Sequence, residues 1–212
     1  MKRFNKKKIK LPTRIIITGK SNTGKSVYAK TLLYYLADNI DKLYIFSPTY
    51  EDSPFQDIEG AEVEHEYNNE ILTGIIDKQK SRLNNDKELK EIVILFDDCI
   101  LDINRGDKAF QTLFTRARHY KISPIVITQK LRIIEPSCRY NADYIFCTKI
   151  FNAMEKDIVF SEYGNMEKRE FYKVLDKYTD NYGILVINNT TAQRDEVLSY
   201  DKGVLELPEF YI

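Results

Sequence analysis

The chain has 212 residues, a length typical of one domain with a substantial core. Hydrophobic residues make up 43% and charged residues 30% of it, which excludes fibrous, collagenous and broadly disordered proteins. Its 32 basic and 32 acidic side chains give a formal net charge of +0, so no general basic field marks it as a nucleic-acid coat protein. We expect one soluble globular domain in which any site for a polyanion is local.

The N-terminal segment is basic. Residues 2–10 carry six basic side chains and no acidic one. We assign residues 1–12 to a basic arm, either a solvated tail or a segment that neutralises phosphates along a duplex, and residues 13–212 to a single domain. No apolar signal-peptide core follows the basic start, and the apolar runs are far shorter than the roughly 18 residues of a membrane span. We therefore expect an intracellular protein that is not secreted and does not insert directly into a membrane.

The first predicted elements are a strand, a glycine-containing turn and a helix. Residues 14–18 (RIIIT) form an apolar run that leads into Gly19. Apolar residues at i, i+3, i+4 and i+7 then predict a helix over about 25–37. A second strand is predicted over 43–47. The polar, acidic residues 49–70 are harder to assign, and helical spacing continues from Leu72 to Leu83.

The rest of the chain continues this alternation. Five more strands are predicted, over residues 92–96, 122–128, 142–147, 183–187 and 196–200. Helices are predicted over 110–117 and 171–178, with another helical stretch before the second of these. Because the first strands are apolar throughout rather than alternating, we predict an α/β fold with a mostly parallel central sheet and helices on both faces. Ligands of such sheets bind at the carboxyl ends of the strands.

A phosphate-binding loop is predicted between the first strand and the first helix. Residues 19–26 (GKSNTGKS) match G-x-x-x-x-G-K-[ST] without a mismatch. In such a loop backbone N–H groups and the helix N-terminus surround the phosphates, Lys25 contacts the β and γ phosphates, and Ser26 is a ligand of Mg²⁺. The residues assigned to nucleotide binding are Gly19, Lys20, Ser21, Asn22, Thr23, Gly24, Lys25, Ser26 and Val27.

An acidic pair follows the third strand. Asp97 and Asp98 come directly after five apolar residues, at the tip of a buried strand. A P-loop protein needs a second anchor for its metal at such a tip. We assign Asp97 to Mg²⁺, directly or through water, and Asp98 to activation of the attacking water. The alternative is a strand-ending turn without catalytic function.

Gln129 follows the fourth strand, where its amide could sense the γ phosphate and hold the attacking water; the alternative is a loop cap. The residues after Thr128 lack the aspartate of a guanine-specific signature, which favours ATP over GTP. An arginine from a neighbouring subunit commonly stabilises charge on the transferred phosphoryl group. The candidates are Arg116, Arg118, Arg132 and Arg139. Arg118 is preferred because it lies at the edge of an apolar helical stripe.

At these positions the sequence resembles the FtsK/HerA superfamily of ring ATPases, within it the genome-packaging ATPases of poxvirus-like large DNA viruses and virophages. The resemblance rests on GKSNTGKS, IFSPTY, IVILFDDC and ARHYKISPIVITQ, which together span residues 14 to about 150. It implies a RecA/ASCE-like P-loop fold and Mg²⁺-dependent ATP hydrolysis that moves double-stranded DNA through a homo-oligomeric ring, a pentamer or hexamer. Lys25, Ser26, Asp97, Asp98 and Gln129 match the family's motif positions, and Arg118 matches that of the trans-acting arginine.

The resemblance also implies a setting for the protein. The expected partners are DNA, further copies of the chain, and capsid or membrane proteins of a virion; the expected location is the host cytoplasm, a viral factory or the virion. One departure is Asp98, since many cellular members carry glutamate there. Two other functions stay open: a P-loop small-molecule kinase of the nucleotide type, and an ATP-dependent switch or assembly protein that does not translocate. DNA-stimulated ATP hydrolysis would distinguish the three.

Overall fold

The computed structural model describes residues 1–193 and 196–212. Its centre is an eight-stranded sheet of order β3-β2-β4-β5-β1-β6-β7-β8. Strands β3 to β6 in this order pair in parallel, and β7 and β8 continue the sheet in antiparallel pairs. The strands are β1 (Ile15–Thr18), β2 (Lys42–Phe46), β3 (Glu62–Glu64), β4 (Ile92–Asp97), β5 (Ile122–Thr128), β6 (Tyr144–Cys147), β7 (Gly183–Asn188) and β8 (Leu198–Lys202).

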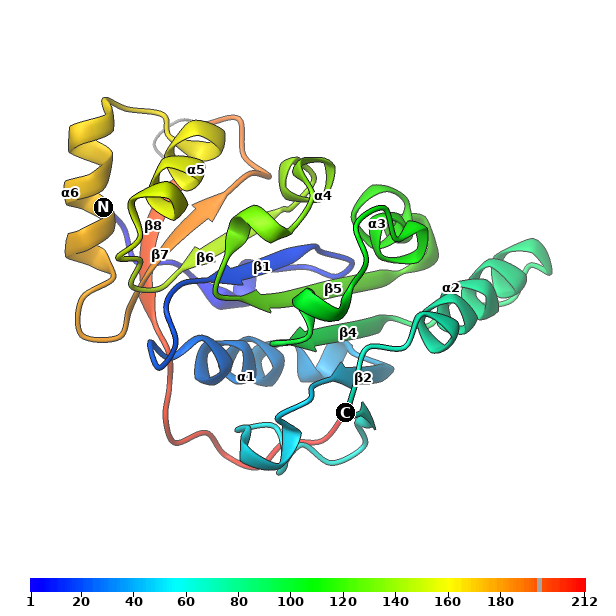
Figure 1. Cartoon of the computed structure of the whole chain (residues 1–212). Helices are drawn as coiled ribbons and strands as arrows, with labels where there is room; N and C mark the ends of the chain where they lie inside the picture. Colours follow the sequence, from blue (N-terminus) through cyan, green and yellow to red (C-terminus); the bar gives the residue numbers. More distant parts are fainter. Residues whose placement is uncertain (194–195) are drawn as a thin grey trace.

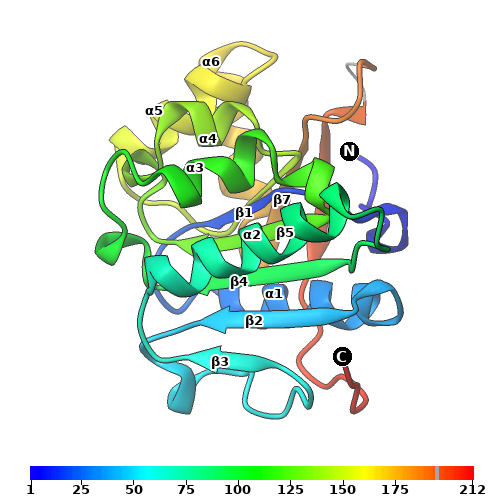
Figure 2. The same ribbon diagram turned by 90° about the vertical axis from the view of Figure 1, so that its right-hand side faces the viewer.

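Helices cover both faces of this sheet, so the predicted α/β architecture is confirmed (Figure 1). Helix α1 lies on one face and the other helices lie on the opposite face. The helices are α1 (Lys25–Leu36), α2 (Asn69–Asn84), α3 (Lys108–Thr115), α4 (Pro136–Tyr140), α5 (Ala153–Tyr163) and α6 (Lys168–Tyr178). Figure 2 shows β3, β2, β4 and β5 side by side, with α2 crossing in front of the sheet.

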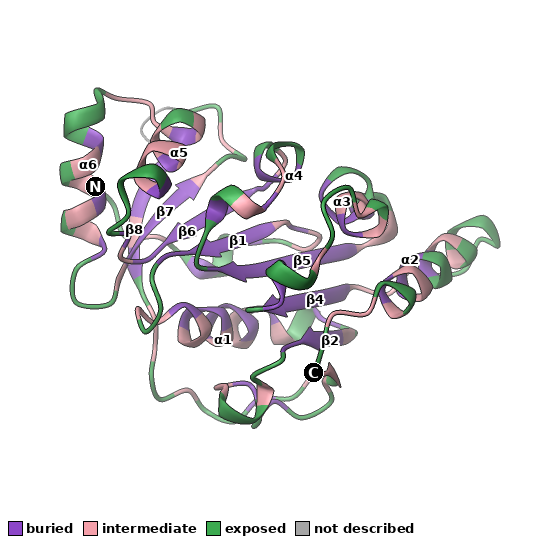
Figure 3. Cartoon of the chain, viewed as in Figure 1, coloured by how far each residue is buried: buried purple, intermediate pink, exposed green. Residues whose placement is uncertain are grey.

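Burial on both faces explains the uninterrupted apolar strands. In β4, Ile94 packs toward α2 and α3 whereas Val93 and Leu95 pack toward α1. All six residues of β4 and all seven of β5 are buried, and in Figure 3 the central strands form one buried layer between partly exposed helices. The sheet therefore lies at the centre of a core that it shares with the helices, and its strand tips are free to carry a site.

Two short elements lie outside the predicted ones. Strand β3 falls within the polar stretch 49–70, where only three residues pair with β2 at the edge of the sheet. Helix α4 has five residues and begins at Pro136. Neither is long enough to show a periodic apolar pattern. The three cysteines are buried free thiols, as their number and spacing indicate.

The N-terminal arm is packed onto the domain, and in this respect a solvated tail is wrong for its central residues. Phe4 packs edge-on against Tyr144 and Phe146, with ring centroids 5.7 Å apart in each pair. Lys6 is 7% exposed, and its Nζ lies 2.7 Å from the carboxylate of Asp201 in β8. The partner of Lys6 lies 195 residues further along the chain, so no local pattern in the arm could show this contact.

No helix within residues 1–193 and 196–212 combines the length and the apolar character that crossing a bilayer requires.

Candidate functional site: a phosphate-binding loop facing two strand tips

The loop between β1 and α1 has a backbone that requires glycine at two positions. Gly19 has φ +149°, and a Cβ atom there would lie 1.9 Å from Thr148 Oγ1. Gly24, the residue before α1, has φ +85°. Larger residues would be strained at both positions, and at Gly19 they would also collide with the segment after β6. The glycines of the sequence motif are thus explained by conformation and close packing.

Neighbouring strands hold this loop in place. The Gly19 N–H donates to the carbonyl oxygen of Thr128 at 3.3 Å, and the Lys20 N–H donates to that of Lys149 at 2.8 Å. The hydroxyls of Thr23 and Thr148 form a hydrogen bond of 2.6 Å. The loop is therefore anchored to the end of β5 on one side and to the segment after β6 on the other, which orders its backbone before any ligand binds.

Lys25 and Ser26 occupy the first turn of α1. Lys25 is 6% exposed, and its Nζ donates to the carbonyl oxygen of Lys20 at 2.9 Å. Burial lowers the pKa of Lys25, and the carboxylates of Asp98 and Asp97 partly oppose this effect. The ammonium group is thus held inside the loop with incomplete solvation, where an anionic phosphate would stabilise it.

The two members of the acidic pair have different environments. Asp97, the last residue of β4, is 3% exposed and accepts a hydrogen bond of 3.3 Å from Ser26 Oγ. Burial, followed by the charge of Asp98, raises the pKa of Asp97 to about 6, although the Ser26 hydrogen bond and the Lys25 charge act in the opposite direction. Asp98 is exposed, with φ 52°. One carboxylate is therefore aimed at the start of α1 and the other faces the open cleft.

Gln129 completes the cleft. It is exposed directly after β5 and lines the same cleft as Asp98 and the residues of the loop, Ser21, Asn22, Gly24, Lys25, Ser26 and Val27. Strand β5 lies between β4 and β1 in the sheet, so the acidic pair, Gln129 and the phosphate-binding loop are adjacent at one edge. The structure thus brings together the predicted loop residues, Asp97, Asp98 and Gln129.

The predicted arginine lies elsewhere. Arg118 precedes β5 and forms an ion pair with Asp143, which also binds Arg14. These residues lie at the amino ends of the central strands, the opposite end from the cleft. Arg118 therefore cannot reach the cleft of its own chain. Its side chain is 48% exposed and remains accessible to another copy.

The other arginine candidates differ in accessibility. Arg139 is 7% exposed, donates to Glu162 at 2.9 Å and also binds a backbone carbonyl, so it is less accessible to a neighbouring subunit than Arg118. Arg132 lies 3.3 Å from Glu155. Arg116 is exposed at the end of α3. Lys130 is exposed beside Gln129, whereas Lys6 of the basic arm is buried.

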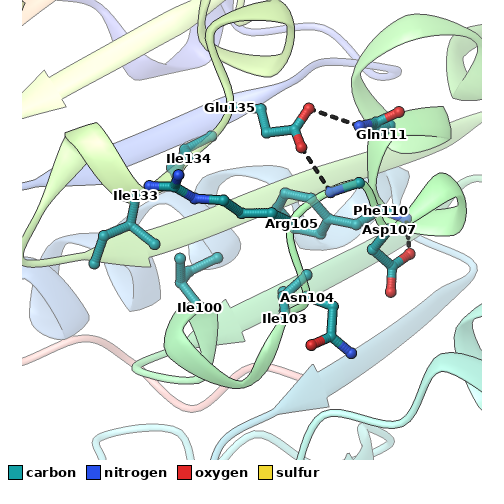
Figure 4. A pocket seen from close by; sticks show the side chains of 11 residues that line it. Ile100, Ile103, Asn104, Arg105, Asp107, Phe110, Gln111, Ile133, Ile134 and Glu135 are labelled. Atoms are coloured by element: carbon teal, nitrogen blue, oxygen red, sulfur yellow. Dashed lines mark hydrogen bonds between the residues drawn. The ribbon is translucent and has the colours of Figure 1, made fainter.

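A small pocket lies between the loops that follow β4 and β5 (Figure 4). Glu135 accepts hydrogen bonds from the Gly106 N–H at 2.7 Å and from Gln111 Nε2 at 2.6 Å. The loop that starts at Asp98 is thereby connected to the segment that starts at Gln129. Nothing in the sequence singles out Glu135, and the same is true of the Thr148 and Lys149 contacts to the phosphate-binding loop.

The residues present fit a nucleoside triphosphate and one divalent cation. The loop presents N–H groups and a buried ammonium to the phosphates, and the Ser26 hydroxyl and Asp97 carboxylate are hard oxygen ligands 3.3 Å apart. Within the described part of the chain, no three His, Cys, Asp or Glu side chains form a metal cluster. Mg²⁺ is usually held by one or two protein groups together with phosphates and water, a donor set to which Ser26 and Asp97 would contribute.

The fold and the loop define a P-loop NTPase of the α/β class. The sequence matches the profile of the Poxvirus A32 protein family over residues 1–206, and the chain belongs to this family. The resemblance drawn from its motifs is thus confirmed.

The chain is also similar to individual proteins. The uncharacterized protein 075L of Invertebrate iridescent virus 6 is 31% identical over 189 residues, covering 87% of this chain and 73% of the relative. The genome packaging NTPase B204 of Sulfolobus turreted icosahedral virus 2, solved with AMP, superposes with a TM-score of 0.70 at 16% identity over 93% of this chain and all of B204. The pCW3 conjugation coupling protein TcpA, solved with ATPγS, gives a TM-score of 0.68 at 14% identity over 90% of this chain and 60% of TcpA.

Proposed function

We propose that this chain is an ATP-hydrolysing motor that moves double-stranded DNA into a viral capsid. The observation that carries the proposal is the edge of the sheet at which the phosphate-binding loop, the acidic pair and Gln129 meet in one cleft. Membership of the Poxvirus A32 protein family and the structural likeness to a viral genome packaging NTPase support it.

In this proposal each side chain of the cleft has one role. Lys25 binds the β and γ phosphates, and Ser26 and Asp97 hold Mg²⁺, which supplies charge neutralisation at the phosphates. Asp98, exposed and facing the cleft, orients and deprotonates the attacking water. Gln129 contacts the γ phosphate and the water.

The segment after Gln129 would transmit the structural change that accompanies loss of the γ phosphate from the cleft to the DNA. Lys130 is exposed next to Gln129, and Glu135 connects this segment to the loop that begins at Asp98. A change at either strand tip would therefore move both loops together. Lys130 is our candidate contact to the DNA backbone.

We further propose that the active form is a ring of several copies, because Arg118 is exposed at the end of the sheet remote from its own cleft. In a ring, Arg118 of one copy would stabilise the phosphoryl group bound by the next.

The test is ATP hydrolysis by the purified full chain with Mg²⁺, with and without duplex DNA, together with its mass in solution. We expect DNA to stimulate hydrolysis and the mass to correspond to several copies. Lys25→Ala should abolish both ATP binding and hydrolysis. Hydrolysis that DNA leaves unchanged would contradict a DNA motor and favour a switch protein, and phosphoryl transfer to a nucleotide acceptor would identify a kinase.

A further inference from the structure

The turn between α6 and β7 contains a tyrosine in a conformation that favours glycine. The Gly183 N–H donates to the carbonyl oxygen of Asp180 at 2.8 Å, and the two central residues, Asn181 and Tyr182, have φ 48° and 59°. This is the backbone of a turn whose second central position is commonly glycine. Asparagine tolerates the left-handed region, but a bulky residue there is an outlier and is strained.

Burial does not compensate for this strain, because Tyr182 is 66% exposed. The ring lies instead over the phosphate-binding loop: a Cβ atom on Gly24 would lie 3.5 Å from Tyr182 Cδ1. In Figure 1 the α6–β7 connection and the loop before α1 lie at the same end of the sheet. A strained backbone thus places an exposed aromatic ring beside the cleft.

Lys149 connects the α6–β7 turn to the phosphate-binding loop. Lys149 Nζ donates to the carbonyl oxygen of Asp176 at 3.2 Å and lies 3.5 Å from the Asp180 carboxylate. The carbonyl oxygen of Lys149 accepts from the Lys20 N–H of the phosphate-binding loop at 2.8 Å. Lys149 therefore fixes the position of the turn relative to the loop.

The layout of the cleft indicates which part of a nucleotide would meet this ring. Asp98 and Gln129 lie on the side of the loop formed by β4 and β5, so the terminal phosphate belongs there. Tyr182 precedes β7, on the other side of β1 in the sheet. A triphosphate that runs across the loop from Asp98 leaves its sugar and base on the side of Tyr182.

We propose that Tyr182 binds the base of the nucleoside triphosphate by stacking on its face. The inference rests on the proposed function, because it takes the phosphate-binding loop as the triphosphate site. Aromatic side chains stack on bases with little dependence on which base is present, since every base has a π face. Tyr182 should therefore add affinity for ATP and GTP alike.

The decisive variant is Tyr182→Gly, which removes the ring and leaves a residue that prefers the observed backbone. We expect nucleotide-free Tyr182→Gly to unfold at the same temperature as the wild type or higher. Its dissociation constants for ATP and GTP should rise about 5- to 150-fold, the range of one base–aromatic stack. Binding of Mg²⁺-tripolyphosphate, which carries neither base nor sugar, should change less than about twofold.

Two further variants complete the measurement by calorimetry. Tyr182→Phe keeps the stacking face and should bind ATP like the wild type. Tyr140→Ala, which removes another exposed tyrosine (64%) at the amino end of β6, should change nothing.

Two results in Tyr182→Gly would overturn the inference. Equal losses for ATP and tripolyphosphate would mean that the ring supports the loop, and unchanged ATP binding would mean that it has another partner. If the wild type binds ATP no more tightly than tripolyphosphate, base recognition fails while the proposed ATPase stands. If the wild type binds and hydrolyses no nucleotide, the proposed function itself fails.

Discussion

The two ends of the central strands differ in whether their carboxylates form ion pairs. At the amino ends, Asp143 is 5% exposed and accepts hydrogen bonds of 2.9 to 3.1 Å from the backbone and side chain of Arg14. At the carboxyl ends, Asp97 and Asp98 form no ion pair with any described residue, although Asp97 is buried. One end is arranged for stability, and the other keeps its charges available for a ligand.

Positive φ angles follow the same division. Four of the six non-glycine residues with positive φ in the described chain belong to loops at the carboxyl ends of the parallel strands, namely Asn22, Asp98, Asn181 and Tyr182. Asn and Asp tolerate this region, so Tyr182 alone among the four is strained by it, and such strain concentrates at functional sites. Substitutions at the two ends should therefore have different consequences: at the cleft they should change activity, and at the opposite end they should change stability.

The largest effect should come from Asp98→Asn. An amide cannot accept the proton of the attacking water, so we expect ATP turnover to fall about 10²- to 10⁴-fold, the usual contribution of a general base. ATP binding should change little, because Asp98 is exposed and Lys25 and Ser26 remain. Steady-state hydrolysis and equilibrium ATP binding test this. Asp102→Asn, an exposed carboxylate nearby, is the control; turnover in Asp98→Asn equal to that of the control would move the base elsewhere.

At the opposite end, Asp143→Ala should act on stability. It would leave the Arg14 guanidinium, 12% exposed, without its carboxylate partner. Removing one partner of a buried pair costs about 3–5 kcal/mol, so the free energy of unfolding in urea should fall by that amount. The control is Asp77→Ala, which breaks the exposed pair with Lys80 and should cost less than about 1 kcal/mol. Equal losses in both variants would remove the distinction between the two ends.

The sequence predicts the cleft better than the rest of the molecule. The loop residues, Asp97, Asp98 and Gln129 each follow an apolar strand, and parallel strands present their carboxyl ends at one edge. The order of the strands along the chain does not reveal that β5 lies between β4 and β1 in the sheet. This arrangement brings the three strand tips together.

Contacts between distant segments could not be predicted. Lys6 carries the basic pattern of a solvated arm, and only its partner Asp201 in β8 explains its burial. Tyr182 shows no motif at all, because its significance lies in a backbone angle and in its closeness to Gly24. Periodicity and motifs describe local segments, whereas these positions depend on tertiary packing.

Asp97 is buried like Asp143, but it lies at the cleft end of the strands. Burial raises its pKa to about 6, so ionised Asp97 destabilises the fold when neither nucleotide nor metal is bound. The folded state binds the Asp97 proton more tightly than the unfolded state does. Protonated Asp97 therefore adds to the free energy of unfolding below about pH 4, and this stabilisation is lost as the pH rises to about 6.

Asp97→Asn should remove this pH dependence. We expect the variant, freed of ligands by chelation, to gain about 2–3 kcal/mol over the wild type at pH 7 and little at pH 4. Urea unfolding at the two pH values measures the difference, with Asp102→Asn as the exposed control. A loss of stability at pH 7 would show that the Asp97 carboxylate stabilises the empty site, contrary to the comparison of the two ends.

Arg118 should give the smallest effect on stability and tests whether the two ends meet between copies. Its side chain is 48% exposed and shares Asp143 with Arg14, so Arg118→Ala should cost less than about 1 kcal/mol. Hydrolysis should nevertheless fall if Arg118 completes the cleft of a neighbouring copy. An equal mixture of Arg118→Ala and Lys25→Ala chains would then contain intact clefts in about one quarter of its interfaces, so activity should return to that order. Arg116→Ala in the same mixture is the control, since Arg116 is also exposed. Recovery with Arg116→Ala instead would transfer the role to that arginine, and full activity of Arg118→Ala alone would confine Arg118 to the stabilising end of the sheet.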